Sequence, residues 1–317
     1  MLAVLVGKIA LENPILSASG TFGTGWEAHS FSTLARVGGL VSKTVTIKPR
    51  PGNPPPRIIE TPSGMLNSIG LENRGLEVFL AEQLPLMKSL GPRVIVNIGG
   101  ESIADFVTLA ERVCSAGIDA LEVNLSCPNV QEGKLLFSTD PRMTEETVRR
   151  VKAVATVPVF AKLSPNVTKV TDIAKAAEQG GADGITAINT LIGMAVDWRR
   201  RKPVLGRIIG GLSGPAIKPV ALRMVWEIAK AVRVPVIGVG GIVNATDVLE
   251  FLVAGACAVQ VGTMNFVDPA VLARLVDELR EILTREGLSA QELVGSLRTE
   301  SEPLACRPDS AGERVQP

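Results

Sequence analysis

The sequence predicts a (β/α)8 barrel, an α/β fold in which eight parallel strands close into a cylinder inside a ring of helices. Three observations lead to this prediction. Short apolar runs alternate with stretches of helical spacing eight times within about 270 residues. The runs are continuously apolar, as parallel strands covered on both faces require. The chain of 317 residues is long enough for one barrel of ~250 residues with extended loops.

The predicted strands begin after a Gly, Pro or polar residue and end in small or polar residues. They cover 14–19, 39–45, 93–99, 120–126, 158–164, 184–190, 235–241 and 258–264. An open doubly wound sheet is the alternative arrangement. The first run, however, is not followed by the GxGxxG pattern with an acidic residue about 20 positions later that such sheets use to bind dinucleotides.

Apolar residues recur at helical spacing between the predicted strands. The segments concerned are 76–87, 103–113, 148–154, 173–177, 217–228, 248–253 and 271–279. Asn244, before the segment 248–253, and Thr144, before the segment 148–154, are the expected N-caps. We expect one domain over residues 1–298, followed by a flexible polar tail at 299–317.

Three loops are longer than a barrel requires, and each follows a strand. They are 46–66, 128–141 and 191–214. Loops after strands lie at the carboxyl end of a barrel, where barrel enzymes build their active sites. The third loop contains the basic cluster WRRRK at 198–202.

Composition argues against several classes of function. Lys and Arg number 33 against 32 Asp and Glu, a net charge of +1, so we expect no nucleic-acid partner. The longest uncharged run, 251–267, is short for a membrane span and is broken by glycines. Four cysteines without CxxC spacing and a single histidine, His29, predict no metal site and no Ser-His-Asp triad. Free thiols and a start without a signal-peptide pattern favour the cytoplasm.

Two lysines stand at the ends of predicted strands. Burying Lys43 or Lys162 is costly without a partner, which favours an anionic or electron-rich ligand near them. The alternative is a lysine that reaches the barrel mouth and pairs with a carboxylate.

Glycines end the last two predicted strands, as in the phosphate site that barrels build after strands seven and eight. Gly240 and Gly241 end one strand, Gly262 and Thr263 end the next, and Gly214 offers a further backbone amide. The alternative is that these glycines only make turns.

Cys127 is the candidate acid–base or nucleophilic residue. It lies just past a buried strand, is followed by Pro, and is flanked by Asn124 and Asn129. A free thiol has a pKa of about 8.5, which allows partial ionisation near lysines. The alternative is an inert buried thiol, the role we expect for Cys114 and Cys257.

An amide-rich set completes the candidate site: Asn67, Asn124, Asn129 and Asn189. Uncharged donors and acceptors at fixed positions suit a small planar ligand with imide and carboxylate groups. Each asparagine taken alone is also compatible with a turn.

Together these motifs resemble the dihydroorotate dehydrogenase family, over about residues 1–295. The resemblance rests on NPILSASGTFG, SKT, NSIGLEN, NLSCPNV, AKLSPN, AINT, GGLSGPAIKP, IGVGGI and VQVGT. It is strongest to the catalytic subunits of the NAD-linked type 1B. The resemblance implies an FMN-containing barrel that oxidises (S)-dihydroorotate to orotate in pyrimidine biosynthesis. By motif position Cys127 corresponds to the base that removes the C5 proton while C6 gives hydride to the flavin. The quinone-linked membrane type carries Ser there.

The resemblance also implies binding roles by position. The substrate positions are Lys43, Asn67, Ile69, Gly70, Leu71, Asn124, Asn129, Asn189 and Thr190. The FMN positions are Ala18, Ser19, Lys43, Asn124, Lys162, Ile188, Gly214, Gly240, Gly241, Gly262 and Thr263.

Members of the NAD-linked type pair with a subunit that carries FAD and a 2Fe–2S cluster, in a heterotetramer built on a homodimer of catalytic subunits. The loop GMAVDWRRRKPVLGRIIGGLSGPAIKP resembles that type, and its WRRRK cluster either faces the partner or is solvated. Three alternatives stay open: a fumarate-linked dihydroorotate dehydrogenase, an FMN barrel acting on another pyrimidine such as uracil or a tRNA uridine, and a non-catalytic barrel that only holds phosphate.

Overall fold

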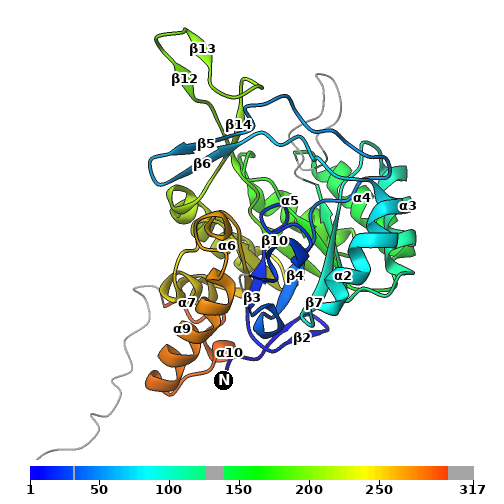
Figure 1. Cartoon of the computed structure of the whole chain (residues 1–317). Coiled ribbons are helices and arrows are strands. Elements are labelled where there is room, and N and C mark those ends of the chain that lie inside the picture. The colour runs from blue at the N-terminus through cyan, green and yellow to red at the C-terminus, as the bar shows by residue number, and fades with distance from the viewer. Residues whose placement is uncertain (31–32, 126–136, 138, 299–317) are drawn as a thin grey trace, which may run out of the picture.

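Eight parallel strands close into one barrel in the computed structural model, which describes residues 1–30, 33–125, 137 and 139–298 (Figure 1). Around the barrel the order is β10-β15-β16-β3-β4-β7-β8-β9. In chain order the strands are β3 (Ile15–Ser17), β4 (Gly39–Val41), β7 (Arg93–Ile98), β8 (Ala120–Asn124), β9 (Val159–Lys162), β10 (Gly184–Ala187), β15 (Val236–Val239) and β16 (Ala256–Val261). Because β16 pairs with β3, the sheet is closed and the barrel prediction is confirmed.

Each barrel strand falls within its predicted run, except that β16 begins at Ala256 rather than at residue 258. All residues of β8, β9, β10 and β15 are buried, which explains why these strands read as continuous apolar runs.

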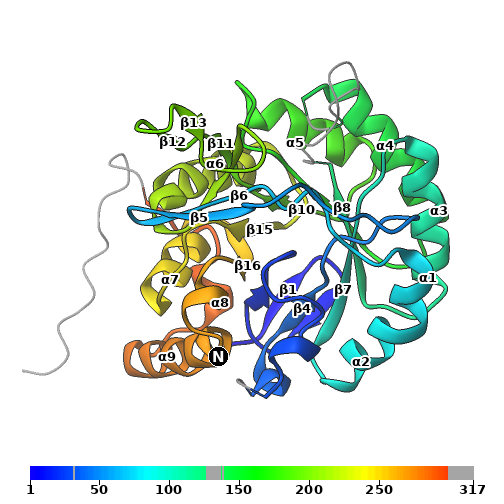
Figure 2. The same ribbon diagram turned by 45° about the horizontal axis from the view of Figure 1, so that its top comes forward.

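Helices surround the barrel and cover its outer face, as Figure 2 shows. They are α1 (Leu76–Val78), the π-helix η3 (Phe79–Gln83), α2 (Leu84–Ser89), α3 (Ile103–Cys114), α4 (Pro141–Val154), α5 (Val170–Gln179), α6 (Lys218–Ala231), α7 (Ala245–Ala254) and α9 (Val271–Glu286). Shorter elements are η1 (Trp26–Ala28), η2 (Leu34–Arg36), η4 (Pro215–Ile217), α8 (Met264–Val267) and α10 (Ala290–Leu293). No helix among the described residues is both long and apolar enough to cross a bilayer.

One of the two expected N-caps is confirmed. The Asn244 side chain accepts a hydrogen bond from Asp247 N at 3.0 Å and opens α7 with a capping box. The other expectation is wrong, because α4 begins at Pro141 with Asp140 as its cap. Thr144 lies inside that helix, where its buried hydroxyl donates to the Phe137 carbonyl at 2.7 Å.

A second, antiparallel sheet crosses the carboxyl end of the barrel (Figure 2). Its strands are β5 (Ile58–Thr61), β6 (Gly64–Asn67), β11 (Leu191–Gly193) and β14 (Gly210–Ser213), in the order β11-β14-β6-β5. It joins the segments 46–66 and 191–214, two of the three that the sequence predicts as long loops. A hairpin of β12 (Val196–Asp197) and β13 (Lys202–Pro203) projects from it (Figure 1). At the other end, the hairpin of β1 (Val4–Val6) and β2 (Ile9–Leu11) precedes the start of β3.

Candidate active site

A pocket opens at the carboxyl end of the barrel, between the strand ends and the antiparallel sheet. It contains about 1540 Å³ of space free of protein atoms, part of it open to solvent. Every described residue that the sequence assigned to cofactor or substrate lines this one pocket. The two remaining positions, Cys127 and Asn129, lie outside the described residues. Assigned residues as far apart in the sequence as Ala18 and Thr263 therefore meet in one pocket, as the predicted barrel requires.

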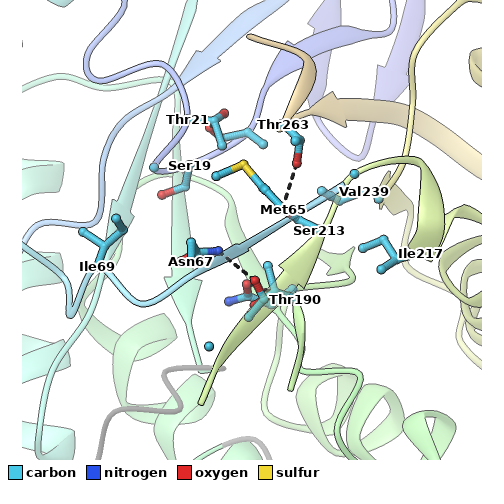
Figure 3. A pocket seen from close by; sticks show the side chains of 18 of the residues that line it. Ser19, Thr21, Met65, Asn67, Ile69, Thr190, Ser213, Ile217, Val239 and Thr263 are labelled. Atoms are coloured by element: carbon cyan, nitrogen blue, oxygen red, sulfur yellow. Dashed lines mark hydrogen bonds between the residues drawn. The ribbon is translucent and has the colours of Figure 1, made fainter. Parts of the chain in front are cut away.

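Hydrogen bonds from side chains join strands within the antiparallel sheet and tie the sheet to the end of the barrel. Asn67 Nδ2 on β6 donates to the Gly211 carbonyl on β14 at 3.2 Å. Thr263 Oγ1, just past β16, donates to Ser213 Oγ at 2.8 Å (Figure 3). A side chain on Gly211 would place its Cβ 2.0 Å from Thr190 Oγ1, so Thr190 reaches its position only because residue 211 is glycine.

A row of polar side chains joins the ends of three barrel strands. Asn124 Nδ2 donates to Thr44 Oγ1 at 3.3 Å, and Thr44 Oγ1 lies 3.5 Å from Ser19 Oγ. Asn124 is buried, whereas Ser19 and Lys43 are half-buried at the pocket wall. The Lys43 ammonium lies 3.4 Å from the point where a Cβ on Gly20 would stand. Gly20, just after β3, therefore lies beside the lysine ammonium.

The wall formed by the Gly-rich strand ends is made of backbone. Gly214 and Gly241 have φ of +95° and +76°, which strongly favours glycine. A Cβ on Gly241 would stand 2.8 Å from Lys218 N, and one on Gly214 would stand 2.7 Å from the Gly64 Cα. Gly262 differs, because its nearest neighbour would be Ala18 Cβ at an ordinary 3.5 Å. The close backbone packing therefore explains Gly214 and Gly241 but not Gly262.

Lys218, the cation beside this wall, is already paired with two carboxylates. Lys218 Nζ donates to Asp247 Oδ1 at 2.5 Å and to Glu250 Oε2 at 2.8 Å. These hydrogen bonds, the one to Asp247 first, raise the pKa of Lys218. An anion at the glycine wall would consequently be held by backbone N–H groups rather than by this ammonium.

Lys162 belongs to a buried polar cluster inside the barrel. Its Nζ lies 3.5 Å from Glu122 Oε1 and 3.4 Å from Gln260 Oε1. The alternative interpretation, a pair with a carboxylate, is confirmed for Lys162; the ligand interpretation stays a prediction, although the lysine lines the pocket.

The sequence analysis missed the other members of this cluster. Glu122, Gln260 and Asn97 are fully buried, and each interrupts an otherwise apolar strand: ALEVN, ACAVQV and RVIVNI. A charged residue in the middle of a buried strand was the signal that would have revealed the cluster.

Comparison with known proteins then places the chain. The family model described as dihydroorotate dehydrogenase matches residues 1–283. The chain belongs to the dihydroorotate dehydrogenase family. It is 52% identical over 297 residues to the "Dihydroorotate dehydrogenase B (NAD(+)), catalytic subunit" of Desulforamulus reducens, covering 93% of this chain and 98% of that protein. Proteins of the same name in Citrifermentans bemidjiense and Bacteroides thetaiotaomicron are 49% and 47% identical over 298 residues, with the same coverage.

The pocket of this dihydroorotate dehydrogenase has two chemically different sides. One side is polar and carries Lys43, Asn67 and Asn124, and the other is the backbone wall at Gly214 and Gly241. The described cysteines take no part in it: burial raises the pKa of the Cys114 and Cys257 thiols, which keeps them protonated and unreactive. The resemblance inferred from the motifs is confirmed at the level of the family.

Proposed function

We propose that this chain is the catalytic subunit of an NAD-linked dihydroorotate dehydrogenase, which oxidises (S)-dihydroorotate to orotate in pyrimidine biosynthesis with FMN as its cofactor. The observation that carries the proposal is that all described residues assigned from the motifs line one pocket of a barrel in this family.

The residues present fit FMN. Gly214 and Gly241 line the pocket with backbone that is packed closely against neighbouring segments, which suits a phosphate group held by N–H donors. Lys162 places a buried ammonium at the pocket, which suits the electron-rich edge of a reduced flavin. When bound, FMN supplies a two-electron acceptor for the hydride that leaves C6 of the substrate.

The protein residues perform the remaining tasks. Lys43 and the amides of Asn67 and Asn189 orient the carboxylate and the imide edge of the substrate, as charged and uncharged donors of fixed position can. The Cys127 thiolate accepts the proton from C5 while the hydride leaves C6, so that a C5=C6 double bond forms and both electrons leave with the hydride. The antiparallel sheet covers the pocket and limits access of water.

The proposal includes a partner. The relatives are named catalytic subunits, which supports a second subunit; we assign to it FAD, a 2Fe–2S cluster and transfer of the electrons to NAD, in a heterotetramer built on a homodimer. In the hairpin, Trp198 is 72% exposed and Arg199 lies over its ring at 4.5 Å. The cytoplasmic location expected from the sequence remains part of the proposal.

An absorption experiment on the purified chain tests the cofactor and substrate. We expect flavin bands that bleach anaerobically with dihydroorotate and do not bleach with dihydrouracil, which lacks the carboxylate. A chain that stays colourless after incubation with FMN, or flavin that bleaches only with dihydrouracil, would overturn the assignment.

A second measurement tests the branch of the family. Reduced protein should transfer its electrons to NAD only when an iron–sulfur partner co-purifies or is added. Fast re-oxidation of the isolated chain by fumarate would instead assign it to the fumarate-linked type.

A further inference from the structure

A closed polar cluster crosses the interior of the barrel beneath the pocket. Glu122 Oε1 accepts from Asn97 Nδ2 at 2.7 Å, and Glu122 Oε2 accepts from Gln260 Nε2 at 2.5 Å. Gln260 also accepts from Lys162 Nζ at 3.4 Å, and the Glu122–Lys162 ion pair closes the ring at 3.5 Å. Asn97, Glu122 and Gln260 come from β7, β8 and β16, and β16 lies opposite β8 in the barrel.

The cluster is buried and charged, which is uncommon in a barrel filled by apolar side chains. Glu122, Gln260 and Asn97 are fully buried, and the side chain of Lys162 is only 6% exposed. Removing one member of such a buried pair is strongly destabilising, because a charge is left without a partner. A cluster kept for stability alone has no need of an ammonium that also lines the pocket.

The geometry of the ammonium points to a positioning role. Lys162 carries three N–H donors, of which one bonds to Gln260 and one is directed by the ion pair with Glu122. Lys162 lines the pocket, so its remaining donor is available to a bound acceptor. Both oxygens of Glu122 are held by amides, so the carboxylate cannot turn away from the lysine.

We propose that Glu122, held by Gln260 and Asn97, is a positioning residue that fixes the Lys162 ammonium at the pocket and thereby sets the reduction potential of the flavin. This inference rests on the proposed function. A positive charge beside the flavin favours its electron-rich reduced form. Without Glu122 the buried ammonium would lose its partner, and it would either lose its charge or move away.

The test measures the FMN midpoint potential of the purified flavoprotein against a redox dye, with a chemical reductant and no dihydroorotate. In Glu122→Gln we expect a shift to more negative potential, in the direction and toward the value of Lys162→Met. The double variant should shift no further than Lys162→Met alone. Glu122→Asp, which keeps the charge, should fall between wild type and Glu122→Gln.

Asp183→Asn is the matched control. Asp183 directly precedes β10, pairs with Lys152 at 2.5 Å and does not line the pocket. This variant should lose stability without any shift in potential. If Glu122→Gln does not fold, Gln260→Leu removes both contacts of the bridging amide and should shift the potential in the same direction.

Two results would overturn the inference. An unchanged potential in Glu122→Gln would leave the cluster a structural role only. A shift to more positive potential would mean that Glu122 merely offsets the lysine charge. Neither result bears on the proposed function. That function would fail separately, if the wild-type chain bound no flavin or if its flavin were not reduced by dihydroorotate.

Discussion

The two ends of the barrel use polar side chains in opposite ways. At the amino end, carboxylates bind the first backbone N–H groups of the strands or of the segments leading to them. Asp183 accepts from Val159 N at 2.7 Å, Asp119 accepts from Val94 N at 2.7 Å, and Glu178 accepts from Arg233 N at 2.6 Å. At the carboxyl end, Lys43, Asn67 and Asn189 line the pocket.

This difference separates residues that hold the fold from residues available to a ligand. Polar groups at the amino end are committed to backbone donors, so their loss should affect stability. Those at the carboxyl end line a cavity, so their loss should affect binding or turnover. Substitutions at each end of the barrel test that separation.

The largest effect is expected at Cys127. Replacing Cys127 by Ala removes the proposed base and should lower kcat for dihydroorotate oxidation by about 10²–10⁴-fold, the usual contribution of a positioned general base. Flavin content and the unfolding midpoint should stay close to wild type. Anaerobic stopped-flow reduction of the flavin measures the effect directly.

Cys114→Ala is the control for Cys127. Cys114 is buried in α3, and burial raises the pKa of its thiol, so the group is protonated at neutral pH and takes no part in proton transfer. This variant should lose some stability and keep its rate of flavin reduction. Equal loss of rate in both variants would contradict the assignment of Cys127.

A smaller effect is expected at the glycine wall. Ala at position 241 would need φ near +76° and would approach Lys218 N to 2.8 Å, so Gly241→Ala should weaken FMN binding by about 10–100-fold, equivalent to about 1.4–2.8 kcal/mol. Fluorescence titration of the apoprotein with FMN measures the affinity.

Gly287→Ala is its matched control. Gly287 also has a positive φ of +64°, but it ends α9 and a Cβ there would meet nothing within 4 Å. The control should lose stability and bind FMN normally. If both variants bind FMN with wild-type affinity, the wall does not hold the phosphate.

At the amino end, Asp183→Ala should change stability alone. The variant loses a charged acceptor for Val159 N and the partly exposed pair with Lys152, and we expect unfolding to become easier by about 1–2 kcal/mol. Urea denaturation measures the change. A lower kcat in the folded variant would break the separation between the two ends.

The sequence supported the barrel and the pocket far better than it supported the antiparallel sheet. Barrel strands are buried on both faces, so their apolar runs are unmistakable, and the order of strand ends along the chain determines which residues meet. The antiparallel sheet has no such signal: β14 reads GGLS, and its contact from Gly211 to Asn67 joins positions 144 residues apart.

The sequence analysis also missed the Glu122–Gln260 contact and placed the start of α4 too late. Glu122 and Gln260 lie on strands that are opposite in the barrel, a relation that no local pattern contains. Thr144 was expected to cap α4, but Asp140 together with Pro141 begins the helix earlier, and the apolar spacing at 148–154 marks only its second half.

The smallest effect tests whether every polar residue at the carboxyl end serves the ligand. Asn244 follows β15 closely, yet its side chain is committed to Asp247 N at 3.0 Å in the capping box of α7. Asn244→Ala should therefore lower stability by about 1 kcal/mol and leave FMN affinity unchanged, as loss of an N-cap does. Thermal unfolding and FMN titration measure the two quantities side by side. Unchanged FMN affinity would show that structural and ligand-facing groups are separated within this end of the barrel as well as between its two ends. If FMN affinity fell instead, the cap would act through Asp247 and Lys218 on the glycine wall, and even a helix cap at this end would serve the ligand.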